Sequence, residues 1–371
     1  MKVDGGNHME QSIYLTLENG TVFQGKSFGA CKPVTGEVVF TTAMTGYLET
    51  LTDPSYYGQM VVHTFPLIGN YGVIPADFES SAPRLSAYIV REWCQSPSNF
   101  RCEGDLDTFL KEKGIVGMYG IDTRALTRMI REHGVMNAKL TLEKPNVTEI
   151  QKELADFSIR HAVASVSIAK TEVLQPEEKK RKVVLWDFGA KKNIGQELVR
   201  RGCEVVCMPQ DSTADEILAQ KPDGIMLSNG PGDPQENTQV VEQLRKLCQA
   251  GIPMFGICLG HQLLALSQGA ATEKLKYGHR GGNQPVKNLR TGRVYITSQN
   301  HGYAVVADSL PDGAELFYVN ANDGTCEGVC YHNMPAFSVQ FHPEASCGPH
   351  DTMFLFDEFI QRIDQRMEKA Q

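Results

Sequence analysis

The sequence predicts an α/β protein of two domains, in which a doubly wound, mainly parallel sheet follows a mixed α+β domain. Three observations support this fold class. A chain of 371 residues is longer than one small domain usually requires. Beyond residue 182, short apolar strands alternate with helices, as they do in parallel sheets covered on both faces. Before residue 166, hairpins and helices follow each other without that alternation. We therefore expect a flexible N-terminus at 1–10, an N-terminal domain at 11–165, a linker at 166–182 and a C-terminal domain at 183–371.

The N-terminal domain is expected to begin with a β-hairpin. Residues 14–23 alternate apolar and polar side chains around Asn19-Gly20, a pair that favours a type I′ turn. An amphipathic helix is expected to open at 121–124, where Asp122 or Thr123 can cap it, and to end at Gly134. The remaining apolar runs predict strands at 38–40, 61–65 and 87–90, and a polar helix is expected near 147–157.

Two segments of the chain lack a regular pattern. Residues 41–58 are rich in hydroxyl groups, glycine and aromatic side chains, which predicts a long loop. Loops of this length are often functional, and a surface Ω-loop is the alternative. Residues 175–182 mix acidic and basic side chains, so we interpret them as a solvated linker rather than a nucleic-acid patch.

The C-terminal domain is expected to carry its active site beyond the carboxyl ends of its strands, as open parallel sheets do. Apolar runs predict strands at 183–186, 204–208, 224–227, 254–257, 294–297 and 336–339. Helical periodicity predicts helices at 193–201, 213–220 and 240–250. The loops that follow strands are therefore the places to look for chemistry.

Cys258 occupies a turn that predicts a nucleophile. The strand at 254–257 runs into Gly256-Ile257-Cys258-Leu259-Gly260 and then into an apolar helix that Gly269 can end. A side chain at such a turn projects from the top of a sheet, above helix N–H groups, as in the G-x-S-x-G turn of hydrolases. The alternative is a buried cysteine beside a tight turn.

His342 and Glu344 are candidates to serve this cysteine. They follow the strand at 336–339 and are two residues apart, so an extended segment places their side chains on one side. Imidazole is the usual base for a thiol, and a carboxylate can orient the ring. His301 is a rival base, but it has no such carboxylate beside it in the sequence. His261 is expected to be structural.

The loop at 230–234 reads Gly-Pro-Gly-Asp-Pro. Two glycines held by two prolines expose backbone N–H groups that can stabilise an oxyanion, although a structural turn has the same composition. The loop at 298–303 offers amide, hydroxyl and backbone groups suited to a polar substrate.

Composition excludes several classes of protein. The net charge of −8 argues against a general affinity for nucleic acid or for an anionic membrane. No apolar run approaches the roughly 18 residues that span a bilayer, and the N-terminus lacks the apolar core of a signal peptide. We therefore expect a cytoplasmic protein. The ten cysteines are scattered without any Cys-x-x-Cys pair, so we expect free thiols and no metal site.

Taken together, these motifs resemble those of the class I, triad-type glutamine amidotransferases. The matching segments are Gly256 to Gln262, the Gly-Pro-Gly-Asp-Pro loop at 230–234 and His342-Pro343-Glu344. The N-terminal half is similar to the small subunits of carbamoyl-phosphate synthetases. That similarity is carried by Gly36 to Phe40, Met44 to Tyr47, Leu51 to Tyr56, Ile68 to Asn70 and Ile121 to Arg124. Two segments after the linker, Asp187 to Lys191 and Gly278 to Pro285, resemble the same subunits.

The resemblance implies glutamine hydrolysis to glutamate and ammonia. Cys258 would attack the amide carbon, His342 would transfer protons, and Glu344 would orient His342. Carried over by motif, the residues that hold L-glutamine would be Ser55, Gly230, Gly232, Leu259, Gln262, Asn300, Gly302 and Tyr303. Ser55 would then bring the N-terminal domain into the pocket. Cys347 stands where the family would lead us to expect proline, and no role is assigned to it.

The resemblance also implies a partner. The chain contains no Gly-x-x-x-x-Gly-Lys-Ser/Thr phosphate loop, so we expect no cofactor in it. ATP and Mg²⁺ are expected only on a large synthetase subunit, which would form at least a heterodimer with this chain and receive ammonia through a tunnel. The carbamoyl phosphate would serve arginine and pyrimidine biosynthesis. The alternatives are a regulatory subunit with vestigial chemistry and another cysteine hydrolase on the same fold.

Overall fold

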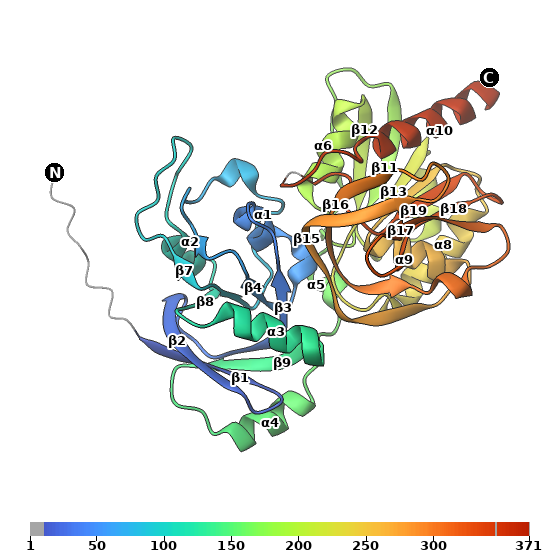
Figure 1. The fold of residues 1–371 in the computed structure, drawn as a ribbon. Coiled ribbons are helices and arrows are strands. Elements are labelled where there is room, and N and C mark those ends of the chain that lie inside the picture. Colours follow the sequence, from blue (N-terminus) through green and yellow to red (C-terminus); the bar gives the residue numbers. More distant parts are fainter. Residues whose placement is uncertain (1–10, 346, 371) are drawn as a thin grey trace. The chain divides into compact units, whose positions relative to one another are not determined.

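The computed structural model describes residues 11–345 and 347–370. They pack into two compact units (Figure 1). Of the described residues, the first unit contains 11–41, 58–75 and 85–158, and the second contains 42–57, 76–84 and those from Ile159 onward. Two segments that precede the expected linker therefore pack with the C-terminal unit. The expectation for residues 1–10 lies outside the described residues.

The first unit is built on a closed barrel. Its strands follow each other around the barrel in the order β1-β2-β8-β6-β4-β3-β9. The neighbours β3–β4, β4–β6 and β6–β8 run parallel, and the other neighbours run antiparallel. The bounds are β1 (Ser12–Leu17), β2 (Val22–Gly29), β3 (Val34–Thr41), β4 (Gln59–His63), β6 (Ala87–Ile89), β8 (Val116–Tyr119) and β9 (Met136–Thr141).

The remaining elements of this unit flank the barrel. They are the parallel pair β5 (Leu67–Ile68) and β7 (Glu92–Trp93), and the helices α2 (Leu106–Glu112), α3 (Thr123–His133) and α4 (Val147–Ala155). Asp122 caps α3 by accepting the Ala125 N–H at 3.0 Å, and Gly134 ends the helix, as predicted.

The predicted hairpin is present, but its turn is not of type I′. Leu15 pairs with Phe23 across β1 and β2. A type I′ turn needs a positive φ at both central residues, whereas here Gly20 has a φ of 86° and Asn19 is not in the left-handed region. The Gly20 N–H donates to the Leu17 carbonyl at 2.9 Å, so Leu17 to Gly20 form the turn. Glycine adopts the positive φ at position 20 without steric cost.

Residues 41–58 are not the bare loop that we expected. They contain helix α1 (Tyr47–Thr52) and the 3-10 turn η1 (Pro54–Tyr56), and a second 3-10 turn, η2 (Pro75–Asp77), follows later. Gly46 starts α1 in the left-handed conformation, so the usual polar cap is missing from the sequence. Tyr47, Leu48 and Leu51 are buried, which anchors the segment.

The second unit contains a ten-stranded sheet in the order β10-β12-β11-β13-β14-β19-β18-β17-β15-β16. The strands β12, β11, β13, β14 and β19 run parallel, as predicted, and antiparallel pairs extend the sheet on both sides. The bounds are β10 (Glu172–Leu174), β11 (Arg181–Trp186), β12 (Cys203–Met208), β13 (Gly224–Leu227), β14 (Met254–Ile257), β15 (Thr272–Asn288), β16 (Val294–Val305), β17 (Ala314–Asn320), β18 (Cys326–Tyr331) and β19 (Ala336–Val339).

Helices cover both faces of this sheet, which makes it doubly wound (Figure 1). Alternate residues of a strand enter different cores: Val184 and Trp186 pack with α7, α8 and α9, while Val183 and Leu185 pack with α6 and α10. The bounds are α5 (Ala162–Val166), α6 (Lys192–Arg200), α7 (Ala214–Ala219), α8 (Thr238–Cys248), α9 (Leu259–Ser267) and α10 (Phe354–Ala370), with 3-10 turns η3 (Pro234–Glu236) and η4 (Ala307–Ser309).

The segment expected as a linker is partly ordered by this sheet. Strand β10 lies within it and pairs antiparallel with β12. Among residues 11–345 and 347–370, none of the helices has the length and apolar character needed to cross a membrane.

Candidate active site

Cys258 lies at the carboxyl end of β14 and at the start of α9, as the sequence predicts. Its backbone has a φ of 53° and a ψ of −105°, which is strained for any residue with a Cβ. The Cys258 N–H donates to the Val339 carbonyl at 2.9 Å, so strand β19 holds the turn in place. The thiol is 2% exposed and lies 3.8 Å from the Asn300 carbonyl oxygen.

The two glycines of the turn are required by close packing. A Cβ on Gly260 would overlap the backbone carbonyl of Leu227 at the end of β13. A Cβ on Gly256 would lie 2.8 Å from the Gly260 carbonyl oxygen. The Gly260 N–H donates to the Ser228 carbonyl at 3.0 Å. The pattern Gly-x-Cys-x-Gly therefore lets α9 start directly against the neighbouring strand.

His342 and Glu344 follow β19, the strand that pairs with β14. His342 Nδ1 lies 2.6 Å from Glu344 Oε1, and both side chains are fully buried. The His342 N–H donates to the Ser298 carbonyl at 2.9 Å, which ties this segment to β16. The other ring nitrogen, Nε2, has no hydrogen-bond partner among the described residues. The carboxylate therefore fixes the ring and leaves one nitrogen available.

The charges around His342 favour the protonated form of its ring. Burial and the nearby Lys191 ammonium both oppose a charge on the ring, but Glu344 and the Cys258 thiol outweigh them and raise the pKa of His342 to about 9. Burial opposes ionisation of Glu344, yet His342 and Lys191 keep the pKa of its carboxyl below the ordinary value. Glu344 therefore stabilises the protonated form of the His342 ring.

Lys191 adds a buried cation that sequence reasoning did not single out. Its Nζ lies 3.5 Å from Asp53 Oδ2 and 3.8 Å from Glu344 Oε1. Burial disfavours the charge, but Asp53 and Glu344 raise the pKa of Lys191 above its usual value. Lys191 also lowers the pKa of the buried Asp53 carboxyl against the effect of burial. The only signal in the sequence was the placement of both residues within motifs quoted above.

Ser55 belongs to the second unit, as part of the segment 42–57. Asp53 caps η1 by accepting the Ser55 N–H at 2.9 Å, and it also accepts Asn300 Nδ2 at 2.9 Å. The Ser55 hydroxyl accepts Asn229 Nδ2 at 3.0 Å. Because Asn229 precedes Gly230, these bonds connect three of the residues predicted to hold glutamine.

The glycines of the 230–234 loop are also set by packing. A Cβ on Gly230 would overlap the Phe188 carbonyl. Gly232 has a φ of 88° and faces Ala162. The loop follows β13 directly, beside the strand that leads to Cys258.

Gln262 connects helix α9 to the substrate-side strand β16. Its Nε2 donates to the Tyr303 carbonyl at 2.7 Å and to Gln340 Oε1 at 2.9 Å. Leu259, the first residue of α9, is buried. Gly302 and Tyr303 are half-buried on β16, which extends through the segment that we had read as a loop.

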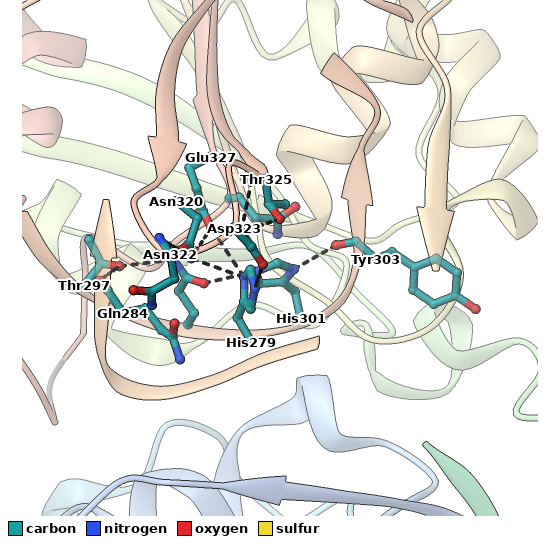
Figure 2. A network of polar contacts seen from close by, with 12 residues as sticks. His279, Gln284, Thr297, His301, Tyr303, Asn320, Asn322, Asp323, Thr325 and Glu327 are labelled. Atoms are coloured by element: carbon teal, nitrogen blue, oxygen red, sulfur yellow. Dashed lines mark hydrogen bonds and ion pairs between the residues drawn. The ribbon is translucent and has the colours of Figure 1, made fainter. Parts of the chain in front are cut away.

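His301 is occupied elsewhere. Its Nδ1 lies 2.8 Å from the Tyr303 carbonyl oxygen and its Nε2 lies 3.2 Å from Gln299 Oε1. Burial, with the neighbouring His279, holds the pKa of His301 well below its usual range. Figure 2 shows its ring in a polar network with His279 and Glu327. These contacts favour His342 as the base.

Two further residues near the turn have settled environments. His261 is buried in α9, with Nδ1 2.8 Å from the Ser338 hydroxyl, and burial lowers its pKa to about 3. Cys347 donates to the Thr45 carbonyl at 3.1 Å, and burial raises its pKa to about 11. The hydrogen bonds of these two side chains are made with Ser338 and Thr45 and not with Cys258.

Comparisons with known proteins match both halves of the chain. The family model described as carbamoyl-phosphate synthase small chain, CPSase domain, matches residues 15–140, and the model described as glutamine amidotransferase class-I matches residues 184–362. The carbamoyl phosphate synthase small chain of Clostridium perfringens is 51% identical over 347 residues, covering 94% of this chain and 98% of that protein. That of Fusobacterium nucleatum is 52% identical over 356 residues, covering 95% and 99%. The carbamoyl phosphate synthase pyrimidine-specific small chain of Bacillus subtilis is 50% identical over 351 residues, covering 94% and 95%.

Proposed function

The chain belongs to the carbamoyl phosphate synthase small chain family, and we propose that it hydrolyses glutamine for that synthase through Cys258, His342 and Glu344. The observation that carries the proposal is the convergence of two segments in one sheet. Strand β14 ends at a cysteine held at a φ of 53°, and the adjacent β19 ends at a buried histidine 2.6 Å from a carboxylate. Such strain in a non-glycine residue is found mainly at functional sites.

The chemistry proceeds by nucleophilic catalysis. In this proposal Cys258 attacks as the thiolate, with the proton already held on Nε2 of His342, and the sulfur bonds to the side-chain amide carbon of glutamine to form a tetrahedral oxyanion. The C–N bond then breaks, His342 gives its proton to the leaving nitrogen, and ammonia departs from a glutamyl thioester. Water, deprotonated by His342, attacks the thioester carbon and releases glutamate and the free thiol. The raised pKa of His342 suits a group that must hold the proton until the amine leaves.

Backbone N–H groups would stabilise the oxyanion. Leu259 is the first residue of α9, so its N–H has no acceptor within the helix and lies at the positive end of the helix dipole. Gly230 and Gly232 supply a second set of backbone groups beside it. Ser55, Gln262, Asn300, Gly302 and Tyr303 would hold the rest of glutamine, because hydrogen bonds already connect most of their segments.

The ammonia would pass to the large chain of the same synthase, with which this chain would form a heterodimer. In this proposal ATP and Mg²⁺ act only on that partner, where bicarbonate and ammonia become carbamoyl phosphate for arginine and pyrimidine biosynthesis. The chain would work in the cytoplasm. Its family membership supports the partner, since a small chain implies a large one.

Ammonia release from glutamine tests the proposal. The wild-type chain is assayed with and without an added large chain, beside Cys258→Ser and the matched control Cys248→Ser. Cys248 is a half-buried thiol on α8, next to α9, and lies outside the proposed machinery. We expect Cys258→Ser to lose activity and Cys248→Ser to retain it. Equal ammonia release from wild type and Cys258→Ser would remove Cys258 from the mechanism.

The two alternatives give different results in the same experiment. A regulatory subunit with vestigial chemistry would release no glutamate even with the large chain bound. Another cysteine hydrolase would turn over peptides, and a glutamine-like affinity reagent would fail to label Cys258. Labelling of Cys258 that glutamine prevents would support the glutaminase.

A further inference from the structure

A buried cluster of two histidines and one glutamate lies in the antiparallel part of the ten-stranded sheet (Figure 2). His279 comes from β15, His301 from the paired β16 and Glu327 from β18. Each offers one ligand atom, and these atoms lie within 4.8 Å of one another. All three residues are at most 9% exposed. The chemistry proposed for Cys258 does not use this cluster.

Each histidine has one ring nitrogen held from outside the cluster. His279 Nε2 lies 2.8 Å from Asp323 Oδ2, and His301 Nδ1 lies 2.8 Å from the Tyr303 carbonyl oxygen. A carbonyl or carboxylate oxygen accepts, so these two nitrogens carry the hydrogens. The remaining nitrogens, His279 Nδ1 and His301 Nε2, then present lone pairs to the interior of the cluster. Histidines that bind metals show this arrangement, in which the outer N–H donates to a carboxylate or a backbone carbonyl.

Glu327 supplies a second, independent observation. The residue is fully buried, and its Oε2 has no hydrogen-bond partner among the described residues. Its Oε1 accepts Asn320 Nδ2 at 3.2 Å, and the carboxyl also interacts with the side chains of His279 and Gln299, but no hydrogen bond of good geometry from the described residues reaches Oε2. A buried carboxylate oxygen without a partner costs free energy unless a cation or a donor meets it.

The environment of His301 Nε2 also favours a cation in the cluster. It faces Gln299 Oε1 at 3.2 Å, which places two acceptors against each other. Exchanging the amide atoms of Gln299 does not resolve this contact easily, because its Nε2 donates to Thr297 Oγ1, and that hydroxyl already donates to Gln284. A cation beside both atoms would satisfy them.

We propose that His279 Nδ1, His301 Nε2 and Glu327 Oε2 bind one divalent transition-metal ion of the zinc type. Two imidazoles and a carboxylate suit Zn²⁺ and its neighbours, and Gln299 Oε1 is available for a fourth position. Ligand atoms of a tetrahedral site lie about 3.3 Å apart, so small side-chain rotations would close the cluster around the ion. The ligands come from three strands, and for this reason the cysteine spacing that argued against a zinc site gave no hint of it.

The contact between His279 Nδ1 and Glu327 opposes the proposal, because it also fits a structural ion pair without a metal. His279 Nδ1 lies 3.5 Å from Glu327 Oε1 and 3.5 Å from Asn320 Nδ2. A proton on Nδ1 would make His279 a cation between Asp323 and Glu327, and the cluster would then be a structural ion pair. Both contacts are long for hydrogen bonds, and neither reaches Glu327 Oε2.

Metal content measured on the purified full chain tests the proposal. The protein is stripped with a chelator, given one equivalent of Zn²⁺, passed through a desalting column and analysed by mass spectrometry for zinc, iron, manganese, cobalt, nickel and copper. We expect one tightly held ion in wild type. Glu327→Gln preserves the shape and the bond to Asn320 but removes a ligand, and should weaken binding more than about 100-fold. Asp323→Asn removes an outer contact and should weaken it by about 10–100-fold.

A surface pair provides the matched control. His332 Nε2 lies 2.8 Å from Glu315 Oε2, and both residues are exposed enough to be solvated. His332→Gln should retain the ion. Because Glu327→Gln keeps all ten cysteines, loss of the ion in this variant separates the cluster from thiol binding. Zn²⁺ should also raise the melting temperature of wild type and not that of Glu327→Gln. Each protein is compared with itself, with and without Zn²⁺, so the test remains valid if the variant is less stable.

Cobalt gives an answer from wild type alone. Co²⁺ in a nitrogen and oxygen site shows weak visible bands without the strong thiolate-to-metal charge-transfer band. That spectrum, abolished by Zn²⁺, would support the cluster. A thiolate spectrum, or equal Zn²⁺ affinity in wild type and Glu327→Gln, would overturn it. Cys258→Ser should bind the ion as wild type does, so failure of the metal site and failure of the glutaminase proposal are distinguishable.

Discussion

Replacing Lys191 by methionine should destabilise the second unit strongly, although the side chains have similar volume. The Lys191 ammonium lies between Asp53 and Glu344, and both carboxylates are buried. Removing the ammonium leaves two buried carboxylates without this partner. Breaking a buried ion pair in this way typically lowers the free energy of unfolding by about 3–5 kcal/mol. For a unit of this size that corresponds to a fall in melting temperature on the order of 10 °C. The matched control is Lys192→Met, an exposed neighbour that should change stability by about 0.5 kcal/mol or less.

The pH dependence distinguishes lost charge pairing from lost packing. The pKa values of Asp53 and Glu344 are lowered in the folded protein, so their pairing stabilises above the ordinary carboxyl pKa and is lost as the pH falls. Without Lys191, burial should raise the pKa of Asp53, whereas His342 still pairs with Glu344, and protonation of Asp53 should relieve part of the penalty in mild acid. Urea unfolding at pH 8 and pH 5 should therefore show a larger gap between wild type and Lys191→Met at pH 8. Adding Asp53→Asn should recover part of the loss. Equal gaps at both pH values, or a Lys191→Met variant as stable as Lys192→Met, would refute the charge explanation.

Three further predictions concern other contacts. Gly260→Ala should unfold at markedly lower denaturant because its Cβ would overlap the Leu227 backbone, with a loss of several kcal/mol, whereas an alanine tolerated without loss would contradict the packing argument. The stability of wild type should fall as the pH rises from about 6.5 through 9, since a raised pKa stabilises below the ordinary value, and His342→Gln should show less of this fall in urea titrations. Asp122→Ala should cost about 0.5–2 kcal/mol by removing the cap on the Ala125 N–H, whereas Asp122→Asn should retain most of the stability, and equal losses would argue against the cap.

Periodicity predicted the parallel strands and their helices because each is dictated by local burial. Strands β13 and β14, and residues 183–186 of β11, are continuously apolar and are covered on both faces, so each is recognisable alone. Helix α1 was missed because it begins at a left-handed Gly46 and has no side-chain cap. Strand β10 was missed because an edge strand with exposed side chains has the composition of a linker. Both elements exist through contacts with distant parts of the chain, and local sequence does not carry that information.

The candidate site divides in the same way. Cys258 could be singled out from the sequence because the flanking glycines mark a turn that is too tightly packed for a Cβ. His342 could be singled out because Glu344, its partner, lies two residues away. The pairing of Lys191 with Asp53 could not be predicted, since a buried salt bridge between residues far apart in the chain has no characteristic spacing in the sequence. The hydrogen bonds from Asn229 and Asn300 are hidden for the same reason.

Free-energy costs of several kinds are concentrated at the carboxyl ends of β14 and β19. A left-handed cysteine costs about 1–3 kcal/mol, and the neighbouring lysine and carboxylates must be desolvated. None of these features would be selected for stability alone, because a glycine at position 258 and apolar residues in place of the charges would avoid both costs. They become reasonable if the turn must present a thiol to a bound amide while the charge network holds the imidazole in one orientation. On this argument Cys258→Gly should be more stable than wild type and inactive, which is the relation expected of a strained catalytic residue and not of a packing cysteine.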